Sequence, residues 1–206
     1  MAMSVEYAIG DLPEGFEPRG SVAIDTETMG LNLQRDRLCL VQLCDEGGRV
    51  CLVHFPRGTS YDAPRLRALL QDTSLRKIFH FGRFDVGVLW GAFRVVTAPV
   101  VCTKIASKLV RTYTDRHGLK DLCRELLGED LSKQEQSSDW GAPLLTGPQK
   151  EYAARDVIYL HRLWEKLEQM LCREERFALA ESCFDFLPTR ALLDANGWNH
   201  IDIFEH

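Results

Sequence analysis

The sequence predicts an α/β fold with a mixed sheet of about five strands, flanked by helices and followed by a helical C-terminal third. Short apolar runs come first, helix-like segments lie between them, and mostly helical patterns follow residue 103. This order of elements is typical of a layered α/β fold. At 206 residues, the chain fits a single domain that covers residues 1–206 and can bury a sizeable core.

The predicted strands are short apolar runs at residues 22–26, 38–44, 50–55, 77–81 and 98–102. The turn residues Asp45, Glu46, Gly47 and Gly48 separate the second run from the third, and they predict an antiparallel hairpin. Residues 10–20 are rich in glycine and proline, so they predict a loop that leads into the sheet.

The predicted helices cover residues 64–71, 83–93, 103–111, 117–127, 148–172 and 174–195. The helix at 148–172 has the clearest pattern. It starts after Thr146 and Gly147 with Pro148, a residue that is tolerated in a first helical turn. Its apolar stripe has helical spacing and consists of Ala153, Val157, Leu160, Trp164, Leu167 and Leu171.

The composition is that of an ordinary soluble globular protein, with 45% hydrophobic and 27% charged residues. A net charge of −5 argues against a protein whose whole surface grips nucleic acid, although a local basic rim remains compatible with it. The seven cysteines show no metal-binding spacing, which predicts reduced thiols. No signal segment and no apolar run approaching ~18 residues is present, so we expect a cytoplasmic protein.

Asp25 and Glu27 follow the apolar residues 22–24 at the C-terminal end of the first predicted strand. Because they are two positions apart, their side chains project from the same face of a strand. Ligands of α/β sheets commonly gather at such strand ends. The alternative is a surface strand end with two solvated acids, which the apolar run before them disfavours.

Asp85 falls in the first turn of the helix predicted at 83–93. A purely structural role is an alternative here, because the N-terminal end of a helix stabilises an acid through the helix dipole. His80 comes shortly before, at the end of a predicted strand. It is a possible substrate contact, but packing or capping is the more common role for a single histidine there, and we assign it no catalytic role.

Tyr152 and Asp156 lie four residues apart in the helix predicted at 148–172, so they share one face beside its apolar stripe. That helix therefore presents a phenol and a carboxylate at the edge of the core. The alternative is a tyrosine packed on the sheet and an aspartate paired with Arg155 or Arg162.

Several carboxylates that converge on one spot repel each other unless cations hold them. Oxygen-rich clusters suit magnesium or manganese, and a pair of such ions about 3.5–4 Å apart is the usual machinery of phosphodiester cleavage. The acids therefore predict a metal-dependent nuclease.

These segments together resemble the DEDD superfamily of 3′–5′ exonucleases, which has a ribonuclease H-like fold. Asp25 and Glu27 match the first motif, Asp85 the second, and Tyr152 with Asp156 the third motif of the tyrosine subclass. The resemblance is closest to the ribonuclease D catalytic domain and spans roughly residues 20–170.

Further details of the resemblance refine this assignment. The histidine subclass would place histidine at position 151, where Glu151 stands, and residues 131–140 resemble a segment that ribonuclease D carries before its third motif. Ribonuclease D continues into helical RNA-binding domains, whereas this sequence ends with an extension at 174–206 that predicts a helix packing back on the core. Phe81 replaces the asparagine often found in DNA-proofreading domains, which disfavours a proofreading role.

The resemblance implies two divalent ions, Mg²⁺ or Mn²⁺, and a role for each motif residue. Asp25, Glu27 and Asp156 would hold the ion that activates water. Asp25 would also touch the second ion, with Asp85 in support. Tyr152 would position the attacking water.

The resemblance also implies contacts with the terminal nucleotide. Thr28 would contribute its backbone and Leu31 an apolar wedge, and ordinary packing is the alternative for Leu31. The candidates for phosphate contacts are the basic residues near the motifs, for which a solvated charged face is the alternative: Arg35, Arg37, Lys104, Lys120 and Lys133.

The expected activity is that of an exoribonuclease that removes nucleoside 5′-monophosphates from the 3′ ends of single-stranded RNA. The expected role is 3′ processing or turnover of tRNA or small RNAs. A single-strand DNA 3′–5′ exonuclease and a catalytically inactive nucleic-acid-binding domain are the alternatives. No residue in the sequence identifies contacts to the ribose 2′-hydroxyl, the group that distinguishes RNA from DNA.

Overall fold

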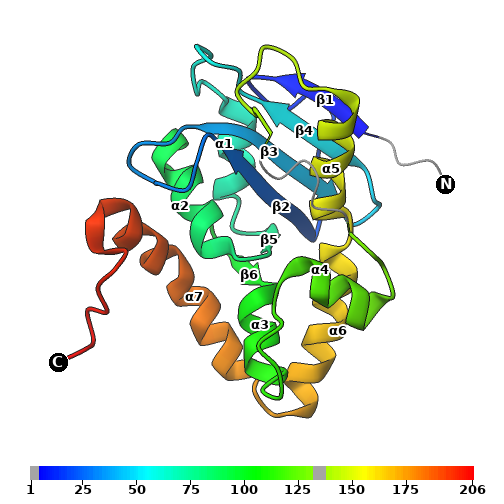
Figure 1. Cartoon of the computed structure of the whole chain (residues 1–206), viewed down its shortest axis with the longest axis vertical. Coiled ribbons are helices and arrows are strands. Elements are labelled where there is room, and N and C mark those ends of the chain that lie inside the picture. Colours follow the sequence, from blue (N-terminus) through cyan, green and yellow to red (C-terminus); the bar gives the residue numbers. More distant parts are fainter. Residues whose placement is uncertain (1–4, 132–137) are drawn as a thin grey trace.

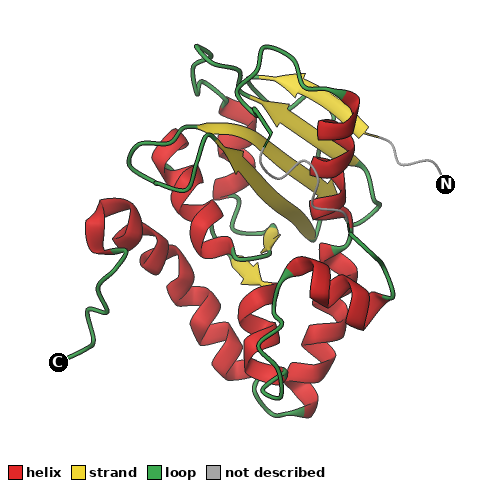
Figure 2. Ribbon diagram, viewed as in Figure 1, coloured by secondary structure: helices red, strands yellow, loops and turns green. Residues whose placement is uncertain are grey.

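The computed structural model describes residues 5–131 and 138–206. Its sheet is mixed and has six strands in the order β1-β4-β3-β2-β5-β6, and most of the sheet lies in the upper half of the molecule in Figures 1 and 2. The strands are β1 Val5–Ile9, β2 Ser21–Thr28, β3 Leu38–Asp45, β4 Val50–His54, β5 Arg76–Phe79 and β6 Val100–Cys102. The α/β class and the mixed sheet that the sequence predicts are confirmed.

The strand pairing explains why the sheet is mixed. β2, β3 and β4 form an antiparallel meander, and the predicted hairpin lies between β3 and β4. β5 and β6 extend the sheet beyond β2 in parallel, and β1 adds to its other edge in parallel with β4. β1 is the strand that the sequence does not predict, because its five residues are partly exposed and include the charged Glu6.

The helices are α1 Pro64–Gln71, α2 Gly82–Phe93, α3 Thr103–Val110, α4 Leu119–Leu122, α5 Gly147–Ile158, α6 Leu160–Arg173 and α7 Phe177–Leu193. Two π-helical turns, Cys123–Leu127 and Asp194–Trp198, extend α4 and α7. α5 packs against β2, β3 and β4, whereas α3, α6 and α7 pack on one another below the sheet (Figure 1). The C-terminal third is helical, as predicted.

The helix predicted at 148–172 is two helices that meet at Tyr159. Thr146 and Gln149 form a capping box at the start of α5, because each side chain bonds the backbone N–H of the other residue. Val157 and Leu160 are both buried on either side of the break. The apolar period therefore runs through the junction, which is why the sequence pattern does not reveal it.

The strands β3 and β4 are almost entirely buried, and with the buried first half of β2 they supply the centre of the core. All seven cysteines lie within the described residues, and none of them is paired in a disulfide. Among the described helices, none has the length and apolar character that crossing a membrane requires.

Candidate active site

The strand β2 carries the first two acids on one face of the sheet. Asp25 lies opposite Gln42 of β3, and Glu27 lies opposite Leu40. Because side chains alternate along a strand, Thr26 points to the opposite face. The i, i+2 spacing predicted from the sequence thus places both carboxylates on the face that α5 covers.

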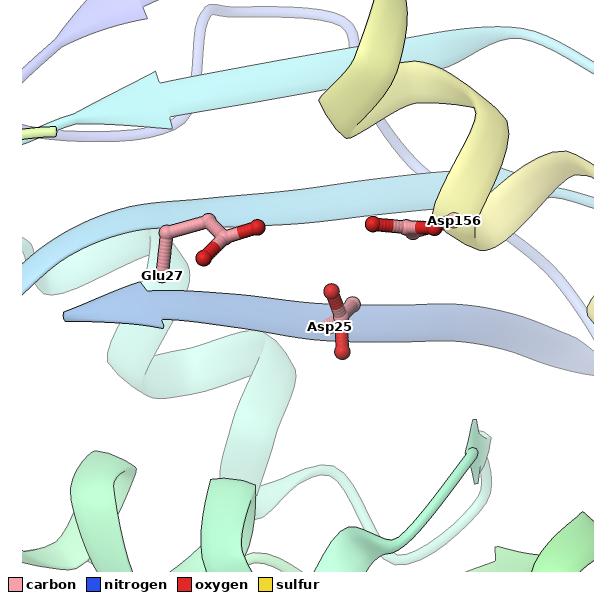
Figure 3. Close-up of side chains that lie close together, drawn as sticks. All are labelled: Asp25, Glu27 and Asp156. Atoms are coloured by element: carbon pink, nitrogen blue, oxygen red, sulfur yellow. The ribbon is translucent and has the colours of Figure 1, made fainter. Parts of the chain in front are cut away.

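The helix α5 brings the third motif over this face. Asp25, Glu27 and Asp156 each place one carboxylate oxygen in a group of three oxygens that lie within 4.8 Å of one another. Figure 3 shows the three side chains converging, two from β2 and one from α5. Tyr152 lies one turn earlier on the same helix face, and the interaction of its hydroxyl with Asp156 lowers the pKa of that carboxyl.

Asp85 lies behind this cluster. It sits in the first turn of α2, where its side chain is almost fully buried, with only 3% of the residue exposed. The Thr26 hydroxyl donates to its Oδ1 at 2.6 Å. Asp85 is also the neighbour whose charge raises the pKa of Asp25 most strongly. The structure therefore brings all four predicted acids together, three in direct convergence and the fourth in support.

The electrostatics of the four carboxylates are unfavourable when they are ionised together. Burial raises the pKa of Asp25 and of Glu27 well above the usual value, and repulsion from the neighbouring carboxylates adds to this. Burial also raises the pKa of Asp85 and of Asp156 to about 7, against the lowering effect of the hydrogen bonds from Thr26 and Tyr152. The Tyr152 pKa is raised, first by burial and then by the charge of Asp156, so its phenol stays protonated.

These carboxylates fit a divalent metal site. Within residues 5–131 and 138–206, no ion pair joins any of the four to a lysine or arginine. In particular, Arg155 pairs with Glu151 and Arg162 with Glu129, so neither neutralises Asp156. Hard oxygen ligands that lack a protein cation are the donor set that Mg²⁺ and Mn²⁺ prefer.

The acids line an open cavity of about 710 Å³. Thr28, Leu31 and His80, the predicted substrate contacts, line it as well. Leu31 is 85% exposed, which excludes ordinary packing. His80 bonds Thr103 Oγ1 through Nδ1 at 2.9 Å, and burial lowers its pKa to about 3, so it is neutral.

The basic residues have different positions. Lys104 and Lys120 line the cavity, and the Lys104 ammonium lies 4.1 Å from the centre of the Phe81 ring. Arg35 pairs with Asp36 at the rim of a neighbouring cleft. Arg37 is turned away from the acids, because it donates to the carbonyl oxygens of Phe55 and Thr59 at 3.3 Å. Lys133 lies outside the described residues.

The structure adds three residues that the sequence pattern does not single out. Gln42 is fully buried and donates from Nε2 to Asp25 Oδ2 at 3.3 Å. Thr26 bonds Asp85 as described above, and Trp140 packs its ring against Tyr152 with 6.1 Å between ring centres. A polar residue in the apolar run 38–44 is the signal that points to Gln42.

Comparison with known proteins places this site in a family. A family model described as a 3′–5′ exonuclease matches residues 6–172. Ribonuclease D of Acidiphilium cryptum is 34% identical over 155 residues, 75% of this chain and 39% of that protein. DNA polymerase I of Aquifex aeolicus is 34% identical over 176 residues, 82% of this chain and 28% of that protein. The chain therefore spans only about two-fifths or less of the length of these relatives.

Solved structures match more of the chain. NrnC of Brucella melitensis bound to pGG is 54% identical with a TM-score of 0.94, and 100% of each chain is covered. The same protein with bound Mg²⁺ is 53% identical with a TM-score of 0.93, covering 99% of this chain and 100% of that one. Escherichia coli RNase D is 30% identical with a TM-score of 0.75, covering 84% of this chain and 45% of that one. The chain thus belongs to the 3′–5′ exonuclease family of the DEDD superfamily, alongside ribonuclease D.

Proposed function

We propose that this chain removes nucleoside 5′-monophosphates one at a time from the 3′ ends of single-stranded RNA, using two divalent ions, Mg²⁺ or Mn²⁺. The observation that carries the proposal is the convergence of Asp25, Glu27 and Asp156 within 4.8 Å. The Tyr152 hydroxyl acts on the same cluster, because it lowers the pKa of Asp156. The Mg²⁺-bound structure of a relative that is 53% identical supports the choice of metal.

We propose for these residues the catalytic roles that the resemblance implies, and the convergence of the acids supports them. Asp25, Glu27 and Asp156 would hold one ion, and Asp25 would share the second with Asp85. Such ions lower the pKa of the attacking water and stabilise the departing 3′ oxygen. Because the pKa of Tyr152 is raised, its phenol keeps its proton, so it orients the water by hydrogen bonding and does not act as a base.

The cavity would hold the terminal nucleotide. The exposed side chain of Leu31 offers an apolar surface to the last base, and Thr28 lies beside the acids. His80 is neutral and lines the same cavity, where it would contact the substrate without taking part in proton transfer. Lys104 and Lys120 supply positive charge for backbone phosphates in a chain that is otherwise acidic.

The choice of RNA rests on the relatives. The Brucella melitensis protein, which is 54% identical, is bound to pGG, and several of the matched relatives are named ribonuclease D. We propose that this chain acts on short RNA 3′ ends, in the 3′ processing or turnover of small RNAs or tRNA. The free thiols support a reducing compartment, and we therefore propose the cytoplasm.

Single-stranded DNA is the second candidate substrate, because the matched relatives include DNA polymerase I of Aquifex aeolicus. A domain without catalysis is set aside, since the chain belongs to an enzyme family and retains all four acids and Tyr152.

One experiment separates these candidates. Single-stranded RNA and DNA oligonucleotides of the same sequence, labelled at the 5′ end, are incubated with the full chain and Mg²⁺, and pGG and its deoxy counterpart are assayed in parallel. We expect a ladder of products shortened from the 3′ end and faster turnover of the RNA substrates. Faster turnover of DNA at every length would overturn the RNA assignment, and cleavage of a circular strand would overturn the requirement for a free 3′ end.

A further inference from the structure

We propose that His54, on the strand β4, is a positioning residue for the catalytic tyrosine Tyr152 and acts through Trp140. The inference rests on the proposed role of Tyr152 in orienting the attacking water. His54 does not line the catalytic cavity, and no motif of the sequence includes it.

His54 is fully buried and uses both ring nitrogens. Nδ1 lies 2.5 Å from the hydroxyl oxygen of Tyr7 on β1, and Nε2 lies 3.0 Å from the backbone carbonyl oxygen of Trp140. The Lys150 ammonium, from the first turns of α5, lies 3.8 Å from the centre of the Tyr7 ring. The histidine therefore joins the edge strand β1, its own strand β4 and residues 138–146, the segment before α5.

These partners determine where each proton lies. A carbonyl oxygen only accepts, so Nε2 must carry the proton that it donates to Trp140. Burial lowers the pKa of His54 against the raising effect of the hydrogen bond to the Trp140 backbone, and the charges of Lys150 and Arg37 lower it further, so the ring is neutral. In a neutral ring the other nitrogen is an acceptor, and the Tyr7 hydroxyl must therefore donate to Nδ1. One tautomer satisfies every partner.

The bond to His54 fixes the backbone of Trp140 beside the site. The Trp140 side chain is buried, its residue only 1% exposed, and its ring packs on Tyr152 with an interplanar angle of 40°. Trp140, like Tyr152 and Asp156, lines the catalytic cavity. The position of the tyrosine ring thus depends on an indole whose backbone is held by the sheet.

The bond between His54 and Trp140 matters because α5, unlike a strand, has no backbone hydrogen bonds to the sheet that fix its position. Backbone hydrogen bonds hold β2 to its neighbouring strands, whereas the position of Tyr152 depends on how the segment before α5 packs. Gln149 adds a second bond to that segment, from Nε2 to the Asp139 carbonyl oxygen at 3.3 Å. A misplacement of about 1 Å in a catalytic group can cost on the order of 100-fold in rate, so a loosened Trp140 should be measurable in kcat.

Two substitutions of His54 separate its two bonds. In His54→Gln the amide nitrogen lies near the place of Nε2 and keeps the donor for Trp140. In His54→Asn the shorter side chain reaches only the side of Tyr7 and loses that donor. We expect His54→Asn to lower kcat on labelled RNA by about tenfold, with the Mg²⁺ dissociation constant unchanged by calorimetry. His54→Gln and the control Tyr7→Phe should each retain kcat within about twofold. Equal losses in His54→Gln and His54→Asn would overturn the proposal.

A double-mutant cycle tests whether the effect passes through the tyrosine. If His54 acts by positioning the Tyr152 hydroxyl, His54→Asn should lower kcat no further in a Tyr152→Phe background. A general loss of structure would lower it by the same factor in both backgrounds, and this additivity would overturn the proposal. Tyr152→Phe with wild-type turnover would remove the proposed role of the tyrosine itself, and the inference with it, before His54 is considered.

A second variant covers the case in which His54→Asn does not fold. Trp140→Phe keeps the backbone carbonyl and its bond to His54 but shrinks the ring that contacts Tyr152. We expect a lower kcat that is not additive with Tyr152→Phe, and a changed near-ultraviolet circular dichroism signal from the ring pair. Wild-type kcat in Trp140→Phe, or additivity with Tyr152→Phe, would overturn the proposal.

Discussion

The site has two halves that are held in place in different ways. The strand half consists of Asp25 and Glu27 on β2, with Asp85 behind them. The helix half consists of Tyr152 and Asp156 on α5, and both halves line the same cavity. β2 is bonded on both sides, to β3 and to β5, and its register places both acids on one face. α5 instead depends on its capping box and on the contacts of the segment before it.

This difference in how the two halves are held should separate metal binding from turnover. The strand half lies at the centre of the core, where an eight-residue strand sets the positions of Asp25 and Glu27. The helix half must be placed by contacts between residues far apart in the sequence, such as His54 with Trp140. We therefore expect changes in the strand half to act mainly on metal binding, and changes around the helix half, apart from Asp156 itself, to act mainly on kcat.

The largest expected effect is that of removing the metal, which both halves need. Because the carboxylates supply no nucleophile of their own, turnover should cease in excess EDTA and return with Mg²⁺ or Mn²⁺. Calcium should bind and yet support little reaction, since its flexible coordination holds the water poorly. The measurement is the release of nucleoside 5′-monophosphate, with each metal added back to chelated enzyme. Robust degradation in EDTA would contradict a metal-dependent site.

Substitution in each half should separate metal binding from turnover. Asp25→Ala removes a ligand shared by both proposed ions, so it should abolish activity and weaken Mg²⁺ binding. Tyr152→Phe keeps the ring and deletes only the hydroxyl, so kcat should fall on the order of a hundredfold while Mg²⁺ affinity stays nearly unchanged. Calorimetry and single-turnover rates on the same preparations give both quantities. Near wild-type turnover in Tyr152→Phe, alongside loss in Asp156→Asn, would make the tyrosine a packing residue.

The pH dependence should involve both halves, because the pKa of Asp85 and that of Asp156 are both raised to about 7. A raised pKa in the folded state means that protonation stabilises the metal-free fold. That stabilisation is fully present below about pH 4, the usual pKa of a carboxyl, and is lost as the pH rises through about 7. The increase in Tm that Mg²⁺ causes should therefore be larger at pH 8 than at pH 6, since protons compete with the metal. Thermal unfolding with and without Mg²⁺ at both pH values measures it, and an equal increase at both would contradict the raised pKa values.

The two halves also differ in how much the sequence reveals. Local spacing predicts which acids share a face, because i, i+2 on a strand and i, i+4 on a helix are geometric facts. The supporting residues are set by tertiary contacts that no local period encodes. Gln42 meets Asp25 only through the register of β2 and β3, and His54 meets Trp140 across 86 positions of the sequence. The edge strand β1, which carries Tyr7, is missed because its partly exposed residues give no apolar run, and only its pairing with β4, far along the sequence, makes it a strand.

A smaller effect is expected from the residue that supports Asp25. Gln42→Leu keeps the approximate volume and removes the amide that donates to Asp25 Oδ2 at 3.3 Å. Residues that orient metal ligands typically contribute 10–100-fold to metal affinity or activity. Because this bond is long, we expect about tenfold weaker Mg²⁺ binding, with kcat at saturating metal little changed. The pattern would be the reverse of that expected for His54→Asn. A fall in kcat with unchanged affinity would place Gln42 with the helix half.

The smallest effect is expected at an exposed anchor of the segment before α5. Arg57 forms a bidentate ion pair with Asp139, at 2.8 and 3.0 Å, but both side chains are more than half exposed. Water and salt screen such pairs, and its backbone N–H still donates to the Gly141 carbonyl oxygen at 3.2 Å. Arg57→Gln should therefore leave kcat within about twofold of wild type. Its kcat should be well above that of His54→Asn, although both residues contact the same segment. The wild type and both variants are compared at low and high salt, because salt weakens the Arg57–Asp139 ion pair in the wild type and in His54→Asn, whereas Arg57→Gln lacks that pair. A loss in Arg57→Gln as large as that in His54→Asn would mean that any loosening of this segment disables the tyrosine, and that the buried histidine holds no special position.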